Sequence, residues 1–188
     1  MLRRDLQGLS IIEVLICLAI IAILSTISAP GFSRLSQKYQ AEKVINELQR
    51  LISLTRASAV ESGKIVTFCK SIDGQHCGGN WHQGGIVFTD QNADHQLNND
   101  DQLLYSMPAF KLAGRVKFRA FQNKQYLQMT PLGFTNYQNG NFTYCPESND
   151  ASLAQQLVIS RSGRTRYAID SDGDGYRENS KGKPLTCP

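Results

Sequence analysis

Apolar residues occur along the chain in three successive patterns, and the first is an almost unbroken run at residues 9–29. A helix rises about 1.5 Å per residue, so this run is long enough to cross the roughly 30 Å hydrocarbon core of a bilayer. A polar leader, residues 1–8, precedes the run, whereas a signal peptide carries its cleavage site after a shorter apolar stretch. We therefore predict a transmembrane helix rather than an ordinary signal peptide.

The second pattern covers residues 30–62. Pro30-Gly31 predicts a kink or break, because proline lacks a backbone donor and clashes with the preceding turn. Beyond it, apolar side chains recur every three or four residues, and charged side chains occupy the other face. The positions on the less polar face are Phe32, Leu35, Tyr39, Val44, Leu48, Leu51, Ile52 and Thr55. We expect an amphipathic helix that ends near Ser62-Gly63, because glycine commonly stops helices.

The third pattern, over residues 63–188, consists of short apolar or alternating runs separated by clusters of Gly, Asn, Asp and Pro. The runs are IVTF, GGIVFT, LLYSM, RVKFRAF, YLQMT, NFTYC, QQLVIS and TRYAI. Such runs are typical of antiparallel strands joined by turns. The chain is therefore predicted to have an α+β fold, in which a long N-terminal helix packs on antiparallel β-sheets and a β-rich head ends in a C-terminal tail.

Four of the five cysteines lie in the polar part of the chain, while Cys17 lies in the apolar run as a small apolar side chain. An even number in a translocated head predicts two disulfides, for which three connectivities exist. The short loop between the first two of the four favours the pairs Cys69–Cys77 and Cys145–Cys187. A zinc site that includes His76 and His82 is the alternative, but the chain lacks the CxxC spacing typical of such sites.

Glu13 is the one acidic residue in the apolar run, where a carboxylate costs about 2.5–3.5 kcal/mol on insertion scales. It is either tolerated near the interface, or neutralised by protonation, or functional. The segment GLSIIE at residues 8–13, between a basic leader and an apolar helix, resembles the prepilin motif of type IV pilins and type II secretion pseudopilins. Leu9 departs from that motif, which most often has Phe.

This resemblance implies that a prepilin peptidase removes the leader after Gly8 and methylates the new amine of Leu9. It also implies that Glu13 pairs with the amine of a neighbouring subunit, because two charges that are costly alone in lipid become tolerable together. The implied location is a single pass through the inner membrane, with the head in the periplasm and the subunit incorporated into a pilus or pseudopilus beside other pilins.

The head narrows the family further. In order, the segments IVTFCKSIDGQHC, HQGGIVFTDQNAD, NNDDQLLY, MTPLGF, NFTYC and LVISRSGRTR resemble the GspH/FimT family of minor pseudopilins, and the likeness extends over nearly the whole chain. Residues 163–166, GRTR, are similar to the GRxR motif of the FimT branch, whose members are minor pilins that bind DNA during natural transformation. The resemblance implies a type IV pilin-like fold and a DNA partner.

Basic residues near the C-terminus support a DNA partner independently of the resemblance. The candidate contacts are Arg161, Arg164, Arg166, Lys181 and Lys183. On a strand, Arg164 and Arg166 would share a face, and such a cluster can neutralise phosphates without reading bases. The alternative is an exposed hairpin whose arginines merely solvate a sheet edge, and the nearby Asp170, Asp172 and Asp174 weaken the picture of a simple basic patch.

Two acidic loops partly resemble calcium-binding loops. The first contains Asp90, Asn92, Asp94 and Asp101, but has His95 where such loops need glycine. The second contains Asp170, Asp172 and Asp174, with Lys181 at the twelfth position. Both loops are also explained as Asx-rich turns, so they are weak metal candidates.

The overall charge is +4, and the three histidines lie in one loop-rich stretch. No serine elbow, phosphate loop or paired-carboxylate arrangement is present, so we predict neither an enzyme nor a cofactor. Two functions remain: a minor type IV pilin that binds DNA non-specifically for uptake, or a structural minor pseudopilin of a type II secretion system.

Overall fold

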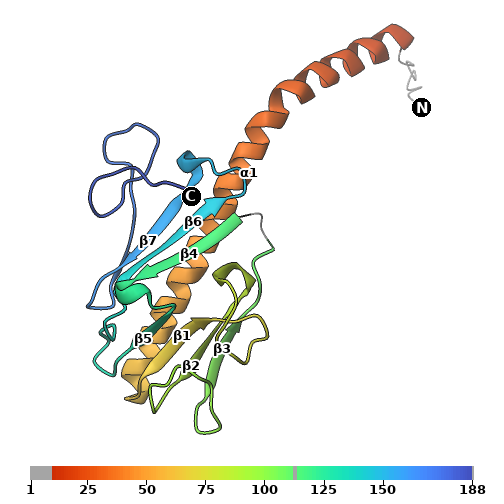
Figure 1. The fold of residues 1–188 in the computed structure, drawn as a ribbon. Helices are drawn as coiled ribbons and strands as arrows, with labels where there is room; N and C mark the ends of the chain where they lie inside the picture. The colour runs from red at the N-terminus through yellow and green to blue at the C-terminus, as the bar shows by residue number, and fades with distance from the viewer. Residues whose placement is uncertain (1–9, 112–113, 188) are drawn as a thin grey trace, which may run out of the picture. The chain divides into compact units, whose positions relative to one another are not determined.

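The computed structural model describes residues 10–111 and 114–187, and for residues 27–30 only the backbone. One long helix precedes eight strands, as the α+β prediction requires (Figure 1). The elements are α1 (Ile11–Ser62), β1 (Val66–Lys70), β2 (Gly85–Thr89), β3 (Leu103–Met107), β4 (Gly114–Ala120), β5 (Tyr126–Met129), β6 (Gly140–Pro146), β7 (Gln155–Ile159) and β8 (Thr165–Tyr167). Three short 3-10 helices, Trp81–Gln83, Phe121–Asn123 and Ala151–Leu153, lie between strands.

Helix α1 ends at Ser62, where the N–H of Gly63 donates to the carbonyl oxygen of Ala59 at 3.1 Å, so the predicted stop is confirmed. Within the described part of the chain, no single helix is both long and apolar enough to cross a membrane. Two stretches of α1, Ile11–Thr26 and Gly31–Ser62, meet these requirements together across a bend of 43°. The bend falls where proline and glycine predict a kink.

The second half of α1 buries one face. The buried positions are Ala41, Val44, Ile45, Leu48, Leu51, Ile52, Thr55 and Ala59. Their three- and four-residue spacing is that of one helix face, as predicted. Phe32, Leu35 and Tyr39 continue the pattern but are 73%, 64% and 69% exposed. The buried part of the predicted amphipathic face therefore begins at Ala41.

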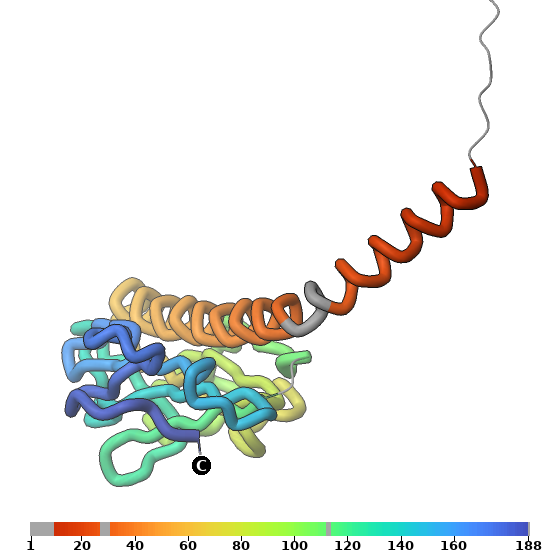
Figure 2. The backbone as a smooth tube through the Cα atoms, turned by 90° about the horizontal axis from the view of Figure 1, so that it is seen from above, coloured from red at the N-terminus to blue at the C-terminus, as the bar shows by residue number. Residues whose placement is uncertain are grey.

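All eight predicted strands are present, and they form two antiparallel four-stranded sheets with the orders β3-β2-β1-β5 and β4-β6-β7-β8. Figure 2 shows the second half of α1 lying along one side of these strands. One hydrophobic core joins that helix face to both sheets. Trp81 helps to join the two sheets, because its ring centroid lies 5.0 Å from that of Phe68 in β1 and 4.7 Å from that of Phe142 in β6.

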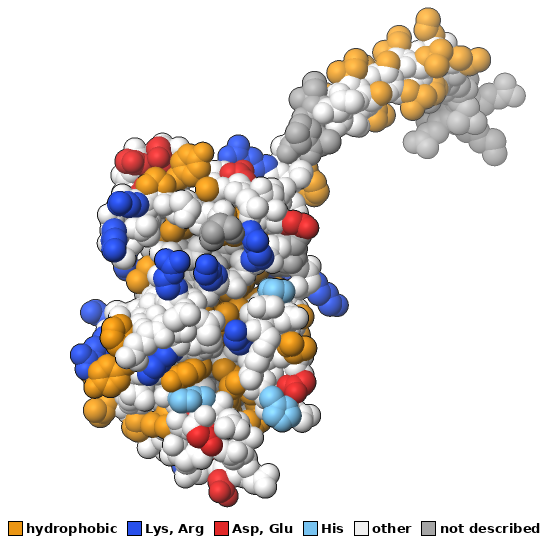
Figure 3. Space-filling view, viewed as in Figure 1, with side chains coloured by type: hydrophobic (Ala, Val, Ile, Leu, Met, Phe, Trp, Pro, Cys, Tyr) orange, Lys and Arg blue, Asp and Glu red, His pale blue; other side chains and the backbone are white. Residues whose placement is uncertain are grey.

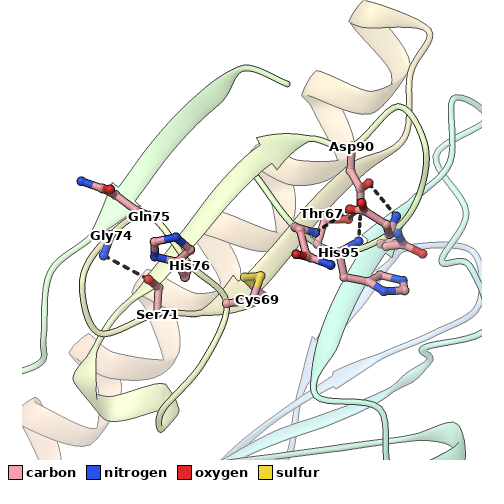
Figure 4. The surroundings of a disulfide bond; sticks show 12 residues. Thr67, Cys69, Ser71, Gly74, Gln75, His76, Asp90 and His95 are labelled. Atoms are coloured by element: carbon pink, nitrogen blue, oxygen red, sulfur yellow. Dashed lines mark hydrogen bonds between the residues drawn. A yellow bond between two sulfur atoms is a disulfide. The ribbon is translucent and has the colours of Figure 1, made fainter. Parts of the chain in front are cut away.

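Both predicted disulfides are confirmed, with Cα–Cα distances of 5.6 Å in Cys69–Cys77 and in Cys145–Cys187. The first closes the loop after β1 (Figure 4), and the second ties the C-terminal tail to β6. The alternative of a zinc site is wrong, because disulfide sulfurs are not available as thiolate ligands. The ring of His76 instead contacts the carboxylate of Asp73, with Nδ1 and Oδ2 2.7 Å apart.

Candidate nucleic-acid interface

The predicted arginines lie on the hairpin that joins β7 to β8. The strands pair in register, with Val158 opposite Arg166, and the turn is closed by a hydrogen bond from the N–H of Gly163 to the carbonyl of Ser160 at 3.0 Å. Tyr167 faces α1, where its hydroxyl donates to Asn46 Oδ1 at 2.8 Å and also contacts Gln49. Since neighbouring side chains alternate along a strand, Arg166 points to the opposite, outward side.

Arg161 and Arg164 lie in the turn, and both are exposed. The guanidinium of Arg161 lies over the ring of Tyr137, 5.1 Å from its centroid, which is a cation–π contact. Arg164 precedes β8 by one residue, and its Nε donates to Ser162 Oγ at 3.2 Å. It is therefore outside the strand, although its carbonyl accepts from the N–H of Ser160 and extends the hairpin. The structure thus gathers the three predicted arginines on one exposed turn and strand.

Gly163 determines how closely this turn approaches the rest of the head. Its φ is +72°, and an added Cβ would overlap the carbonyl oxygen of Gly133 and lie 3.0 Å from Arg56 Cδ. Arg56, on α1, donates through Nε to that same carbonyl at 3.0 Å. Arg56 thus joins the helix to the two turns. The sequence did not predict this role, because only the tertiary contact distinguishes Arg56 from the other charged residues of the helix.

Lys181 and Lys183 lie in a tight turn of the tail, where their backbone N–H groups donate to Asn179 Oδ1 at 2.8 and 3.3 Å. Both lysines are exposed. Lys181 lines a cleft of about 750 Å³ beside β4 and β6, whereas Lys183 does not line it. The structure therefore places Lys181 next to a different strand from the one that carries Arg166.

The other side of this cleft carries three cations that the sequence analysis passed over: Arg115, Lys117 and Arg119 of β4. Figure 3 shows Lys and Arg side chains gathered over β4 and β6 on this face of the molecule. The sequence does contain a signal for this row of cations. In the run RVKFRAF, cations and apolar residues alternate strictly, which puts every cation on one side of the strand.

The first acidic loop uses its carboxylates internally. Asp90 is buried, and its Oδ2 accepts from Thr67 Oγ1 at 2.6 Å and from Gln128 Nε2 at 3.0 Å (Figure 4). The amide of Asn98 lies 3.0 Å from Asp94 and, with other hydrogen bonds, holds the pKa of Asp94 below its ordinary value. Asp101 accepts from the backbone N–H groups of Gln91 and Asn98. These contacts are those of an Asx-rich loop that closes on itself.

The second acidic loop brings the carboxylates of Asp170, Asp172, Asp174 and Glu178 within 4.8 Å of one another. Glu178 was not among the predicted residues. In this loop too, backbone N–H groups donate to the carboxylates: Asp170 accepts from the N–H groups of Gly173 at 2.7 Å and Gly175 at 2.9 Å.

The predicted processing residues Gly8 and Leu9 lie outside the described residues. Glu13 lies in the first turn of α1, where its Oε2 accepts from the N–H of Ser10 at 2.9 Å. Within the chain, its carboxylate therefore satisfies one of the backbone donors that every helix leaves open at its N-terminus.

Comparison with known proteins agrees with this architecture. The family model of the type II transport protein GspH matches residues 44–163, and the prokaryotic N-terminal methylation motif matches residues 3–29. No curated protein sequence matches the chain.

Solved structures of two proteins are similar to it. The type IV minor pilin FimU of Pseudomonas aeruginosa has a TM-score of 0.58 at 17% identity, covering 82% of this chain and 99% of that one. The minor pseudopilin EpsH of the Vibrio cholerae type 2 secretion system has a TM-score of 0.49 at 10% identity, covering 68% and 95%. The likeness to FimU shows a common fold and confirms the predicted type IV pilin-like architecture. Because the GspH model covers well over half of the sequence, the chain belongs to the GspH family, as its resemblance to GspH/FimT proteins predicted.

Proposed function

We propose that this chain is a minor type IV pilin that binds DNA, without sequence preference, during uptake for natural transformation. The observation that carries the proposal is the exposed β7–β8 hairpin, which presents Arg161, Arg164 and Arg166 together. Guanidinium groups pair with phosphates through two parallel hydrogen bonds and release counterions from the DNA. Contacts of this kind position a protein on DNA without reading its bases.

The proposed role also requires that the N-terminal segment be processed and anchor the subunit. We propose that prepilin peptidase cuts after Gly8 and methylates Leu9, and that residues 9–29 anchor the subunit in the inner membrane and later in the filament core. The methylation-motif match at residues 3–29 supports this processing. The head would then lie in the periplasm, an oxidising compartment in which its two disulfides persist. N-terminal sequencing of the mature protein should begin at Leu9.

A structural minor pseudopilin of a type II secretion system is the second candidate, and the matching family model carries the name of such a transport protein. A structural subunit needs the helix and the core, but it does not need three exposed arginines on one hairpin. The hairpin therefore distinguishes the two functions.

The test is the double variant Arg164→Gln with Arg166→Gln, introduced into the chromosomal gene. We expect transformation to fall toward the level of a gene deletion, while subunit abundance, piliation and secretion stay at wild-type levels. A secretion defect on deletion, with transformation unaffected by either change, would instead establish the structural role.

A further inference from the structure

The outward face of the sheet β4-β6-β7-β8 carries a second row of cations that the proposed function does not use. Along β4, buried Val116 and Phe118 alternate with exposed Arg115, Lys117 and Arg119. Alternate residues of a strand are about 6.6 Å apart, so the three charges form a line at regular intervals. This interval is comparable to the separation of successive phosphates along an extended polynucleotide strand.

The pairing register places this row on the same face as Arg166. Arg119 pairs with Asn141, Asn141 pairs with Val158, and Val158 pairs with Arg166. Residues directly opposite each other in neighbouring strands project to the same side of a sheet. Arg119 and Arg166 therefore mark two edges of one surface, about 14 Å apart across three strand spacings.

The cleft of about 750 Å³ lies against the β4 row, and its other wall is the C-terminal tail with Lys181. The Cys145–Cys187 disulfide and the buried Leu185 hold the tail in place. Among the described residues, those that line the cleft include four cations, Arg115, Lys117, Arg119 and Lys181, and no carboxylate.

The floor of the cleft does not neutralise these charges. It is formed by neutral polar side chains that bond to one another, since Gln156 Nε2 donates to Thr143 Oγ1 at 2.9 Å. Arg115 is engaged by the side-chain oxygen of Asn149, which is also neutral. Over the residues that the structure describes, neither Lys117 nor Arg119 belongs to an ion pair. Lys117 and Arg119 thus keep their positive charges for a ligand in solution.

We infer that the β4 row is a second phosphate-binding row, which contacts the sugar–phosphate backbone of the same DNA that the β7–β8 hairpin holds. The inference rests on the proposed function, because it takes DNA as the ligand. The distance of about 14 Å between the rows is comparable to the major-groove width of about 12 Å, so the two rows can reach backbones on opposite sides of one groove.

The test is the variant Lys117→Gln with Arg119→Gln in the full-length processed protein, held in neutral-detergent micelles. Binding to a 30-base-pair duplex of arbitrary sequence is measured across a salt series. We expect the slope of log affinity against log salt to become shallower by about two, one unit for each lost phosphate contact. The effects of this variant and of the hairpin variant Arg164→Gln with Arg166→Gln should add, because the rows are too far apart to share a phosphate.

Two further variants control for net charge and for folding. Lys43→Gln with Lys64→Gln removes the same charge from exposed positions of other segments and should leave the slope unchanged. Lys117→Arg with Arg119→Lys keeps the charges and should bind as the wild type does, with melting temperatures equal throughout.

The outcomes separate the two proposals. If the hairpin variant binds weakly while Lys117→Gln with Arg119→Gln keeps wild-type affinity and slope, the β4 row is not a DNA contact and the proposed function stands. If the Lys43 and Lys64 variant loses as much slope as the β4 variant, only net charge matters and the inference fails. A wild-type protein that does not bind the duplex would overturn both proposals.

Discussion

At the scale of single residues, the position of the arginines depends on Gly163. It adopts a left-handed φ of +72° at a point where the turn touches the carbonyl oxygen of Gly133 and the side chain of Arg56. Most residues with a side chain are strained at such a φ, and here a side chain would also meet backbone that cannot move aside easily. The turn that carries Arg161 and Arg164 can therefore lie against the head only with glycine at this position.

We predict that Gly163→Ala lowers the free energy of unfolding by at least about 2 kcal/mol, from backbone strain together with overpacking. Gly173→Ala is the matched control, because Gly173 also has a positive φ, +80°, but has no atom within 4 Å of an added Cβ. It should lose only about 1 kcal/mol. Denaturant unfolding measures both. Equal losses would show that the contact with Gly133 does not constrain the turn.

A second residue-scale prediction concerns Asp73 in the loop closed by Cys69–Cys77. The hydrogen bond with the His76 ring, and then those from the backbone N–H groups of His76 and Gln75, hold the pKa of Asp73 below its ordinary range. A lowered pKa means that the stabilisation is present above the unfolded pKa of about 3.9 and is lost as pH falls through the lower folded value. An NMR titration of the Asp73 carboxyl should have its midpoint below 3.9, about the model-peptide value, and a midpoint at that value would contradict the account.

At the scale of elements, the sequence predicted the helix and all eight strands, because alternation and turn residues are local signals. It did not predict how the strands divide between two sheets. That division depends on long-range contacts, such as those of Trp81 with Phe68 and Phe142. It also did not predict that the cations of β4 lie on the same face of the sheet as Arg166, since the register that aligns Arg119 with Arg166 runs through β6 and β7.

The two disulfides make a prediction at this scale. They close segments of different length, with sequence separations of 42 for Cys145–Cys187 and 8 for Cys69–Cys77. In the chain-entropy model, loops of these lengths contribute about 4 and about 2.6 kcal/mol respectively. Replacing both cysteines of one pair by serine, followed by denaturant unfolding, should therefore destabilise the protein more for Cys145–Cys187. The reverse order would show that the tail contributes little to the folded head.

At the scale of the whole molecule, the chain combines a helix that resembles a filament anchor with a head that carries the cations. The candidate site was partly predictable, since the arginines around Gly163 lie close together in the sequence, within residues 161–166. Lys181 and the β4 row could not be joined to it from the sequence, because only the folded structure shows that the tail lies against β4 and β6. A local motif is readable from a sequence, whereas a surface assembled from three distant segments is not.

A substitution at Glu13 tests whether the N-terminal helix anchors the subunit in a filament by pairing with its neighbour. If it pairs with the amine of a neighbouring subunit, Glu13→Val should insert into the membrane at least as well as the wild type, because a costly carboxylate has been removed. It should nevertheless enter filaments poorly, as seen by comparing membrane and sheared-filament fractions on immunoblots. Ile12→Val, which leaves the carboxylate in place, is the control and should assemble normally. Normal assembly of Glu13→Val would show that the carboxylate is merely tolerated.

The most direct test of DNA binding by the hairpin is the salt dependence of duplex affinity for the full-length processed protein in neutral detergent. We predict that Arg164→Gln with Arg166→Gln weakens binding to unrelated sequences equally and makes the slope shallower by about two. The melting temperature should not change, because exposed charges alter stability by about 0.5 kcal/mol or less. A double variant that binds duplex DNA as tightly as the wild type at roughly 0.15 M salt, near the physiological value, would contradict the account.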